Sequence, residues 1–390
     1  MEIDLIQTLS IAMLALAFGS FIKSKFEFFR RFFIPSPVIG GLVVSVLVFI
    51  LKKFFNLEIN FDLSLQDFFM NVFFTAIGLA ASFKSLKRTG LLGLKLSLVI
   101  IVLLPLQNII GVGLASLLGI NPLHGVAMGS TSMTGGIGSA ISFGKVMEDM
   151  GAANNTSIGI AAATFGLLVG SLVGGPVAKR LIKKNKLTSK GSVSRLDLEE
   201  KSINLDQKSL MGGVIIIALA ALLGTFINKI LSLSNLNFPY YVGLQFGGLI
   251  LRNIYDLLNK DIGIDAIDTL GNISLNIFLS LALISLDLIA IASLALPMFI
   301  ILISQAIFIA LYTSLITYRF LGKDYDSAVM AAGHCGVGLG QTPNAMANMK
   351  AIIEENGPSD IAMFIFPIVL AISVNLANPI VISFFINIFG

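Results

Sequence analysis

Two short segments of the chain combine glycine, serine and threonine in a pattern suited to binding ions. The first runs Gly129-Ser-Thr-Ser-Met-Thr-Gly-Gly-Ile-Gly-Ser139, and the second runs Ala331-Ala-Gly-His-Cys-Gly-Val-Gly-Leu-Gly-Gln-Thr-Pro343. Main-chain N–H groups at the start of a half-helix bind anions, whereas unwound carbonyls and hydroxyl oxygens can ligate sodium. The residue types in both segments therefore predict binding of an anionic substrate together with sodium.

The two segments also look like copies of each other. Gly136-Ile-Gly138 and Gly338-Leu-Gly340 are offset by 202 residues, and each segment follows an apolar run of a length that crosses a bilayer. Irregular, glycine-rich backbone survives at membrane depth only where it is buried in protein or lines a wet cavity. Such an interruption in each half of a chain indicates the binding site of a transporter.

Neutral polar side chains occur in other apolar runs, from which ionisable side chains are nearly absent. Carboxamide and hydroxyl oxygens suit sodium coupling, whereas a proton relay uses Asp, Glu or His. Alternatively, such side chains bond neighbouring helices, at about 0.6–2 kcal/mol each, and this reading stays open for Gln107, Asn108 and Asn272. The polar residues within the apolar runs are Gln107, Asn108, Asn272, Ser274, Asn276, Ser373, Asn375 and Asn378.

Covalent chemistry has one candidate pair, His334 and Cys335. Adjacent side chains seldom point at each other and no acid lies nearby, so a thiol enzyme is disfavoured. His334 is then a candidate hydrogen-bond donor to a substrate carboxylate. The sequence holds no zinc-ligand spacing, phosphate-binding loop, dinucleotide fingerprint or nucleophile elbow, and its single cysteine excludes an intrachain disulfide. We therefore predict no enzyme activity and no cofactor.

The composition indicates a membrane protein. Hydrophobic residues make up 56% of the chain and charged residues 12%, whereas a soluble domain carries about 25% charged residues. The net charge of +4 does not indicate a nucleic-acid partner, because the basic residues lie between apolar runs. Glu2 and Asp4 precede the first apolar run without a basic region, so we do not predict a cleaved signal peptide.

Apolar windows of about 20 residues predict ten membrane spans. With the N-terminus outside and both glycine-rich segments re-entrant, 22 Lys and Arg residues lie inside and 4 outside, whereas two full crossings would divide them 15 to 11. The positive-inside rule therefore favours two re-entrant loops. The predicted spans are 5–22, 37–51, 66–83, 91–118, 156–178, 209–231, 238–251, 270–287, 289–318 and 359–388, and the loops are about 123–145 and 325–347.

Five spans in each half make the second half enter the membrane from the opposite face. We therefore predict an all-α membrane protein in which ten transmembrane helices form an inverted-topology 5+5 repeat, with both termini outside. The first repeat covers 1–178 and the second covers 209–390, and the polar segment 179–208 is a cytoplasmic linker. Pro37-Val-Ile-Gly-Gly41 and Pro239-Tyr-Tyr-Val-Gly243 match weakly at the same offset.

Longer runs of sequence resemble a known family. The run from Asp324 to Asn348 closely resembles the second signature loop of bacterial sodium/glutamate symporters. Further runs resemble that family in order over almost the whole chain, namely Ile34-Pro-Ser-Pro-Val-Ile-Gly-Gly41, Phe74-Thr-Ala-Ile-Gly-Leu79, Ala163-Thr-Phe-Gly166, Gly174-Gly-Pro176 and Gly271-Asn-Ile-Ser-Leu275. The resemblance implies sodium-coupled uptake of L-glutamate across the bacterial inner membrane. It also implies a homodimer whose loop-bearing part moves as an elevator.

Three positions depart from the family pattern. Ile137 stands where members have His, Ser139 where they have Thr, and Asn375 where some have Asp. A sodium-coupled carrier of another dicarboxylate or hydroxycarboxylate therefore stays open, while a sodium/proton antiporter is disfavoured by the missing buried acid. The substrate-binding candidates are Ser130, Thr131, Ser132, Thr134, Gly136, Gly138, Ser139, His334, Gly338, Gly340, Gln341, Thr342 and Asn344, and the sodium-binding candidates are Asn276, Asn375 and Asn378.

Overall fold

The fold is almost entirely helical. The computed structural model describes residues 1–189, 205–233, 236–286, 292 and 294–390. Within these residues, nine helical stretches are long and apolar enough to cross a membrane. The prediction of a helical, multi-pass membrane protein is therefore confirmed. Two short strands that the sequence did not predict, β1 (Glu2–Ile3) and β2 (Asn60–Phe61), pair in parallel and tie the N-terminus to the connection after the second long helix.

In the described part of the chain, each of the ten predicted spans overlaps one long helix; residues 287, 289–291 and 293 of the predicted spans 270–287 and 289–318 lie outside that part. The tenth helix, absent from the nine apolar stretches, is α11, which carries Arg252 and Asp256 near its end. The helix α9 continues to Asn185, so the first part of the predicted linker 179–208 is helical. Residues 190–204 of the linker lie outside the described part of the chain. The long helices are α1 (Leu5–Lys25), α3 (Ser36–Phe55), α4 (Ser64–Ala80), α6 (Gly90–Leu117), α9 (Asn155–Asn185), α10 (Gln207–Ser232), α11 (Tyr240–Leu257), α12 (Ile264–Ile284), α14 (Ala295–Tyr312) and α18 (Asp360–Phe389).

Both glycine-rich segments form helical hairpins with irregular tips. In the first loop, a π-helical turn contains Gly129 in a non-helical conformation, and Gly136 begins the next helix with a φ of +68°. In the second loop, the chain leaves the helix at Leu339 and begins another at Thr342. The first loop consists of α7 (Pro122–Val126), the π turn η1 (Ala127–Thr131) and α8 (Gly136–Asp149), and the second consists of α16 (Tyr325–Gly338) and α17 (Thr342–Asn356).

The remaining short elements connect the long helices. The helix α2 (Glu27–Arg31) follows α1, and α5 (Phe83–Arg88) joins α4 to α6. The helix α14 continues through a second π turn, η2 (Thr313–Thr317), into α15 (Tyr318–Leu321). A π turn widens the helix locally and is often found near functional sites.

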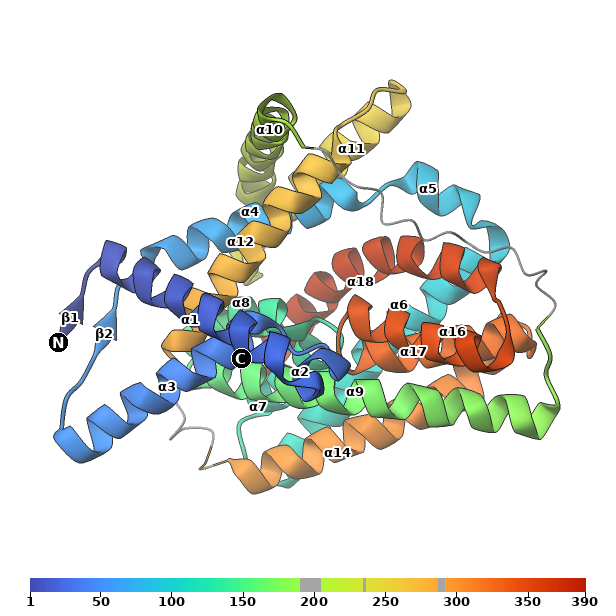
Figure 1. The fold of residues 1–390 in the computed structure, drawn as a ribbon, viewed down its shortest axis with the longest axis horizontal. Coiled ribbons are helices and arrows are strands. Elements are labelled where there is room, and N and C mark those ends of the chain that lie inside the picture. Colours follow the sequence, from blue (N-terminus) through green and yellow to red (C-terminus); the bar gives the residue numbers. More distant parts are fainter. Residues whose placement is uncertain (190–204, 234–235, 287–291, 293) are drawn as a thin grey trace.

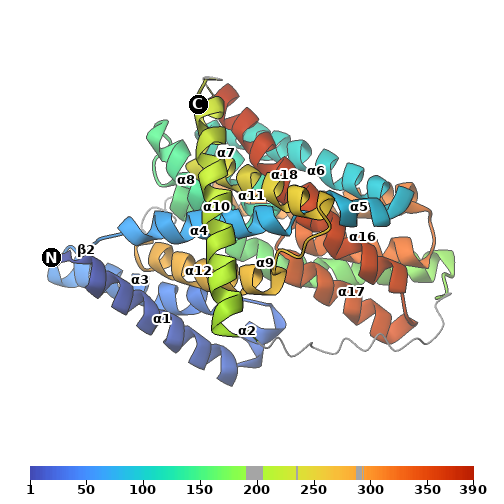
Figure 2. The same ribbon diagram turned by 90° about the horizontal axis from the view of Figure 1, so that it is seen from above.

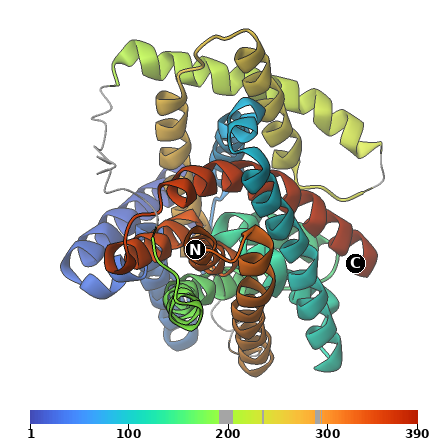
Figure 3. The ribbon, with the colours of Figure 1, turned by 90° about the vertical axis from the view of Figure 1, so that its right-hand side faces the viewer.

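The helices pack as two bundles. Bundle A comprises α1, α3, α4, α10, α11 and α12, and bundle B comprises α6, α9, α14, α18 and the two loops. Figure 1 shows α9 and α14 side by side along one edge of bundle B. Figures 2 and 3 show α10 on the outside of bundle A, where it crosses over its neighbours. Connections between the bundles run through α5 and through contacts of α18 with α4 and of α8 with α12.

Glycine pairs hold the helices of bundle A together in two similar sets. A Cβ on Gly40 would lie 1.7 Å from the Ala15 main-chain oxygen of α1, and one on Gly247 would lie 2.3 Å from the Ala220 oxygen of α10. The next glycines, Gly41 and Gly248, face α12 and α4 in the same way. Small residues of this kind let membrane helices approach closely. In this packing, Gly247-Gly248 of α11 play the part that Gly40-Gly41 play in α3. Gly243 also approaches α10, where its Cβ would lie 2.2 Å from the Asn228 side chain, and the match of Pro37–Gly41 with Pro239–Gly243 stays a prediction.

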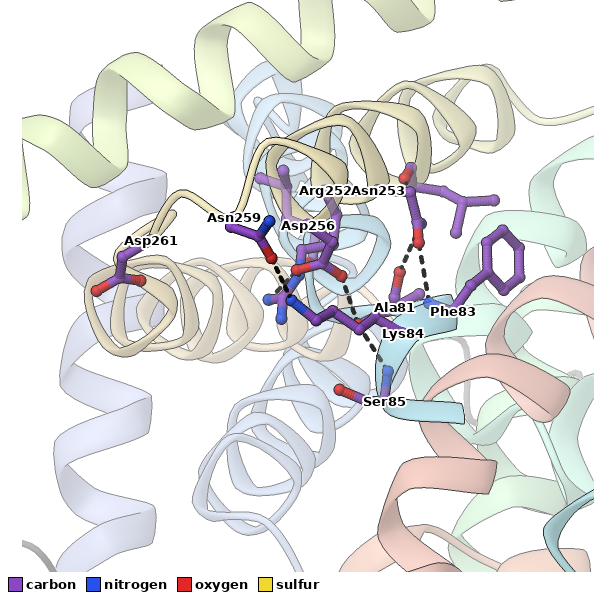
Figure 4. A network of polar contacts seen from close by, with 12 residues as sticks. Ala81, Phe83, Lys84, Ser85, Arg252, Asn253, Asp256, Asn259 and Asp261 are labelled. Atoms are coloured by element: carbon purple, nitrogen blue, oxygen red, sulfur yellow. Dashed lines mark hydrogen bonds and ion pairs between the residues drawn. The ribbon is translucent and has the colours of Figure 1, made fainter. Parts of the chain in front are cut away.

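Polar contacts fasten the break between α4 and α5 to the end of α11 (Figure 4). The Asn253 carboxamide accepts a hydrogen bond from the Phe83 N–H at 2.9 Å and donates one to the Ala81 carbonyl at 3.1 Å. The Asp256 carboxylate, which pairs with Arg252 at 3.2 Å, accepts a further bond from Ser82 at 2.5 Å. These contacts satisfy main-chain groups that the helix break would otherwise leave unpaired, and they attach this end of α5 to bundle A.

Candidate functional site

A cavity of about 260 Å³ lies where the two loop tips meet bundle A. None of the residues that line it has an ionisable side chain, and hydroxyls, carboxamides and apolar groups share its wall. Bundle A contributes Phe73, Phe74, Ile77, Gln245 and Leu275. Bundle B contributes Thr134, Gly135, Gly138, Ser139, Val337, Gln341, Thr342, Pro343, Leu370, Val374, Asn375, Asn378 and Pro379.

The two loop tips touch each other beside this cavity. A Cβ on Gly136 would lie 2.8 Å from Nε2 of Gln341, so glycine is needed for the approach as well as for the positive φ. The first N–H groups of an α-helix such as α8 have no partner inside their own helix, and groups of this kind are able to bind an anion. The helix α17 offers fewer such donors, because Pro343 lacks an N–H and the Asn344 N–H donates to the Gln341 carbonyl.

One glutamine of α6 joins the two tips. The Gln107 amide nitrogen donates a hydrogen bond of 2.7 Å to the Gly338 carbonyl, and its amide oxygen accepts one of 2.6 Å from the Thr134 hydroxyl. The Gln107 main-chain carbonyl accepts a bond of 2.7 Å from the Gln305 side chain. The Gln107 side chain is fully buried, so water cannot easily take its place at the Gly338 carbonyl. Gln107 therefore holds the second tip against the first.

Asn108 and Asn378 fix the unwound part of the first loop. Asn108 accepts a bond of 2.8 Å from the Ser130 N–H and donates one of 2.9 Å to the Ser130 hydroxyl, while Asn378 donates one of 3.0 Å to the Ser130 carbonyl. Gln245 donates a bond of 2.6 Å to the Asn375 carbonyl. The carboxamide oxygens of Asn378 and Gln245 are buried and have no hydrogen-bond partner among the residues that the structure describes. Buried oxygens without donors are costly unless a ligand or water satisfies them.

The comparisons with known proteins agree with one another. A family model described as "Sodium/glutamate symporter" matches residues 1–358. The chain belongs to the sodium/glutamate symporter family. The "Sodium/glutamate symporter" of Escherichia coli (strain K12) is 40% identical over 394 residues, covering 99% of this chain and 98% of that protein. The "Sodium/glutamate symporter" of Haemophilus influenzae is 36% identical over 381 residues, covering 95% and 94%.

Among solved structures, the sodium proton antiporter MjNhaP1 from Methanocaldococcus jannaschii aligns over 99% of the present chain and 96% of the antiporter chain. The TM-score is 0.37 and the identity is 16%. A likeness at this level supports no conclusion about the fold or the function.

The structure brings seven of the predicted site residues of this symporter-family chain to the cavity wall. They come from the tip of the first loop, from the start of α17 and from α18, which are far apart in sequence. The seven are Thr134, Gly138, Ser139, Gln341, Thr342, Asn375 and Asn378. Their convergence supports the prediction that both loops and the last span form one site.

The other predicted residues lie behind the wall. The Ser132 hydroxyl donates to the Gly159 carbonyl at 2.8 Å, the His334 Nδ1 bonds the Thr317 hydroxyl at 2.9 Å, and the Asn344 amide donates to the Leu167 carbonyl at 2.8 Å. Asn276 bonds its own helix. The predicted residues that do not line the cavity are Ser130, Thr131, Ser132, Gly136, His334, Gly338, Gly340, Asn344 and Asn276.

Sequence reasoning missed the contribution of bundle A. Gln245 gave a usable signal, because it is a carboxamide inside an apolar span. Phe73 and Phe74 gave none from residue type alone, since phenylalanine is common throughout the chain. In the structure, the Phe74 ring stacks on the fully buried Tyr241, with ring centroids 3.7 Å apart. This stacking fixes an aromatic surface against the cavity.

The three positions that depart from the family pattern lie in different places relative to the cavity. Ile137 is fully buried in the apolar core and does not line the cavity, whereas Ser139 and Asn375 do. The presence of isoleucine at position 137 therefore does not change the wall that a substrate would touch. Ser139 and Asn375 are the departures at the cavity wall; serine keeps the hydroxyl of threonine, whereas asparagine replaces a carboxylate with a neutral carboxamide.

Proposed function

We propose that this protein is a sodium-coupled symporter of L-glutamate in the bacterial inner membrane. Support comes from its membership of the sodium/glutamate symporter family and from relatives of that name at 36–40% identity over nearly the whole chain. The observation that carries the proposal is the uncharged cavity between the loop tips. It offers hydrogen-bond donors for an anion and carboxamide oxygens without a partner side by side. Transport needs no covalent chemistry and no cofactor beyond sodium as the coupling ion.

The cavity offers two kinds of polar group, hydrogen-bond donors that suit glutamate and oxygen atoms that suit sodium. The N–H groups at the start of α8 and the hydroxyls of Thr134, Ser139 and Thr342 are donors for the glutamate carboxylates. The carboxamide oxygens of Asn378 and Gln245 are acceptors for sodium, which prefers oxygen ligands. Since these acceptors come from bundles B and A respectively, bound sodium would draw the bundles together and prepare the cavity for glutamate.

The inverted 5+5 repeat with two re-entrant loops is part of the same proposal. The ion pair of 3.1 Å between Lys145 and Asp67 ties the end of the first loop to the start of α4. The ion pair of 2.8 Å between Lys179 and Glu355 ties the end of the second loop to the far end of α9. Because the first loop ends where α9 begins, the two loops approach from opposite ends of α9. The repeated glycine packing in bundle A and the distribution of basic residues support the same arrangement, with both termini outside.

We further propose that bundle B carries the cargo while bundle A stays fixed. The cavity lies between the bundles, as an elevator mechanism requires. Hydrogen bonds at the α4–α5 break attach the start of α5 to α11 of bundle A. The apolar outer faces of α1 and α10 are available for a homodimer contact, since Leu14 and Ile230 are each about two-thirds exposed. Light scattering of the purified protein, with detergent mass subtracted, distinguishes a dimer from a monomer.

Uptake of labelled L-glutamate into proteoliposomes tests the proposed function. An inward sodium gradient should drive accumulation that excess unlabelled L-glutamate blocks. Absence of accumulation in vesicles that still exchange labelled sodium would contradict glutamate as the substrate. A panel of dicarboxylates and hydroxycarboxylates would then test the alternative cargo, for which the Asn375 departure is the motivating observation.

A further inference from the structure

A second cavity, of about 400 Å³, opens between the ends of α9 and α14–α15, on the outside of bundle B. It shares no residue with the cavity between the loop tips. We call it the basic groove. Figure 1 shows the two helices that form it running side by side. The groove is lined by Val177, Arg180, Leu181, Lys184, Asn185, Leu311, Ser314, Leu315, Tyr318, Arg319 and Lys323.

The groove changes from apolar to basic along both helices. On α14 and its continuation, Leu311 and Leu315 are 53% and 50% exposed, and Arg319 and Lys323 follow at the same spacing of four residues. On α9, Val177 precedes Arg180 and Lys184. A bilayer presents this order of environments, from acyl chains to charged headgroups. The basic ends of the two helices therefore lie together at the level of a membrane surface.

The four cations of the groove are not neutralised by the described part of the protein. Among the residues that the structure describes, Arg180, Lys184, Arg319 and Lys323 form no ion pair, whereas the nearby Lys179 pairs with Glu355. Asp324 follows Lys323; its carboxylate keeps its negative charge but caps α16 by accepting the Ser327 N–H at 2.8 Å and forms no ion pair with these four cations. Four like charges around one opening repel one another unless an anion lies between them.

The turn that carries Lys323 is held in place. Lys323 has a φ of +62°, which is uncommon for a residue other than glycine or asparagine. Its N–H donates to the Tyr318 carbonyl at 3.1 Å, and the Tyr318 hydroxyl donates back to the Lys323 carbonyl at 2.9 Å. This pair of bonds keeps the backbone of Lys323 at the lip of the groove, opposite the basic residues of α9.

We propose that the basic groove binds the headgroup of an anionic phospholipid. The phosphate lies among Arg180, Lys184, Arg319 and Lys323, and an acyl chain follows the exposed faces of Leu311 and Leu315. Basic pockets between membrane helices bind anionic headgroups through such charges. The assignment to the inner leaflet rests on the proposed topology, in which these residues are cytoplasmic, but the binding itself does not depend on that topology or on the transport function.

Lipid binding to the purified full-length protein tests the proposal. Dioleoyl phosphatidylglycerol is titrated into the detergent-solubilised protein, and the bound fraction is read by native mass spectrometry. The variant Lys184→Gln/Arg319→Gln removes one cation from each wall. A basic residue near an anionic lipid contributes about fivefold to affinity, so the double variant should bind about 30-fold more weakly. The matched control is Lys183→Gln/Lys186→Gln, which removes two exposed charges at the same helix end, outside the groove.

The outcomes separate the lipid from other anions and from general charge. Weaker binding by the groove variant alone, with no comparable binding of dioleoyl phosphatidylcholine, supports the proposal. Equal losses in both variants, or none in either, would overturn it, because binding would then follow net charge or lie elsewhere. Competition by inorganic phosphate at matched concentration would also overturn it in favour of a free-phosphate site. An unchanged midpoint of thermal unfolding shows that the groove variant is folded, whatever the protein transports.

Discussion

Replacing Gln107 with leucine tests whether the contact between the loop tips sustains transport. Leucine keeps most of the side-chain volume but removes the donor to the Gly338 carbonyl and the acceptor for the Thr134 hydroxyl. An unsatisfied buried polar group costs about 1–3 kcal/mol. Thr134 lines the cavity, where water can replace its partner, so we count mainly the Gly338 carbonyl. The joined arrangement of the tips should therefore lose about 2 kcal/mol, a factor of about 30 in an equilibrium constant.

Sodium-driven uptake of labelled glutamate measures this effect. We expect the KM for glutamate to rise at least about tenfold in Gln107→Leu, because only the arrangement with joined tips forms the complete site. Ser97→Ala is the matched control, since Ser97 lies on the same helix and its buried hydroxyl has no hydrogen-bond partner. The control should keep the KM of the original protein within about twofold.

A double-variant cycle makes the reasoning refutable. If Gln107 and Thr134 act through their shared hydrogen bond, Thr134→Val should raise the KM less in the Gln107→Leu background than in the original protein. The expected coupling is about 1 kcal/mol, or about fivefold. A folded Gln107→Leu protein with an unchanged KM would show that the tips do not depend on this glutamine. Fully multiplicative effects of the two substitutions would show that its bond to Thr134 does not contribute.

Four further predictions follow from other parts of the structure. Asn375→Asp adds a negative charge to the cavity wall; the sodium concentration for half-maximal uptake should fall about fivefold, and the effect should disappear as the pH falls and the carboxylate is protonated. Ile137→Ala should lower the free energy of unfolding by about 2–4 kcal/mol while the ranking of competing substrates stays the same, because Ile137 lies in the core; an altered ranking would contradict that placement. Cys335 is fully buried, so a maleimide should label it only in denaturant, and Cys335→Ala should retain uptake; labelling of the folded protein would show that the second loop opens. Asn253→Ala should lower the free energy of unfolding by about 1–3 kcal/mol without raising the glutamate KM. Lys84→Ala, at an exposed position, should change the free energy of unfolding by less than about 0.5 kcal/mol. Equal losses in the two variants would mean that the bonds of Asn253 do not specifically stabilise the α4–α5 break.

The long helices were predictable because membrane burial requires long apolar runs, which are visible in any window of the sequence. The α11 helix was found despite Arg252 and Asp256, because its first two-thirds is apolar and follows a proline. Which glycines of α11 touch α10 could not be predicted from residue type, because it depends on where the two helices cross. In the structure Gly247 approaches Ala220 and Gly224, and Gly243 approaches Asn228.

The candidate site was predictable only in part, because residue type does not reveal which way a side chain points. Ser139 and Gln341 occupy equivalent places in the two glycine-rich segments, and both reach the cavity. Ser132 and His334 are also equivalent to each other, but both turn backwards and bond neighbouring helices. Apart from Gln245, the wall from bundle A consists of aromatic and aliphatic residues, for which a core position and a cavity position look alike in sequence.

The absence of ionisable side chains from the cavity wall determines what an electrical measurement would report. A carrier that moves its own buried carboxylates across the field adds their charge to the current of each half-cycle. Here the wall is neutral, so the charge moved with the cargo should equal the sodium ions minus the single net negative charge of glutamate. The charge moved in the loaded half-cycle would therefore give the number of sodium ions per glutamate directly. Each net charge moved contributes about 2.3 kcal/mol per 100 mV of membrane potential to accumulation.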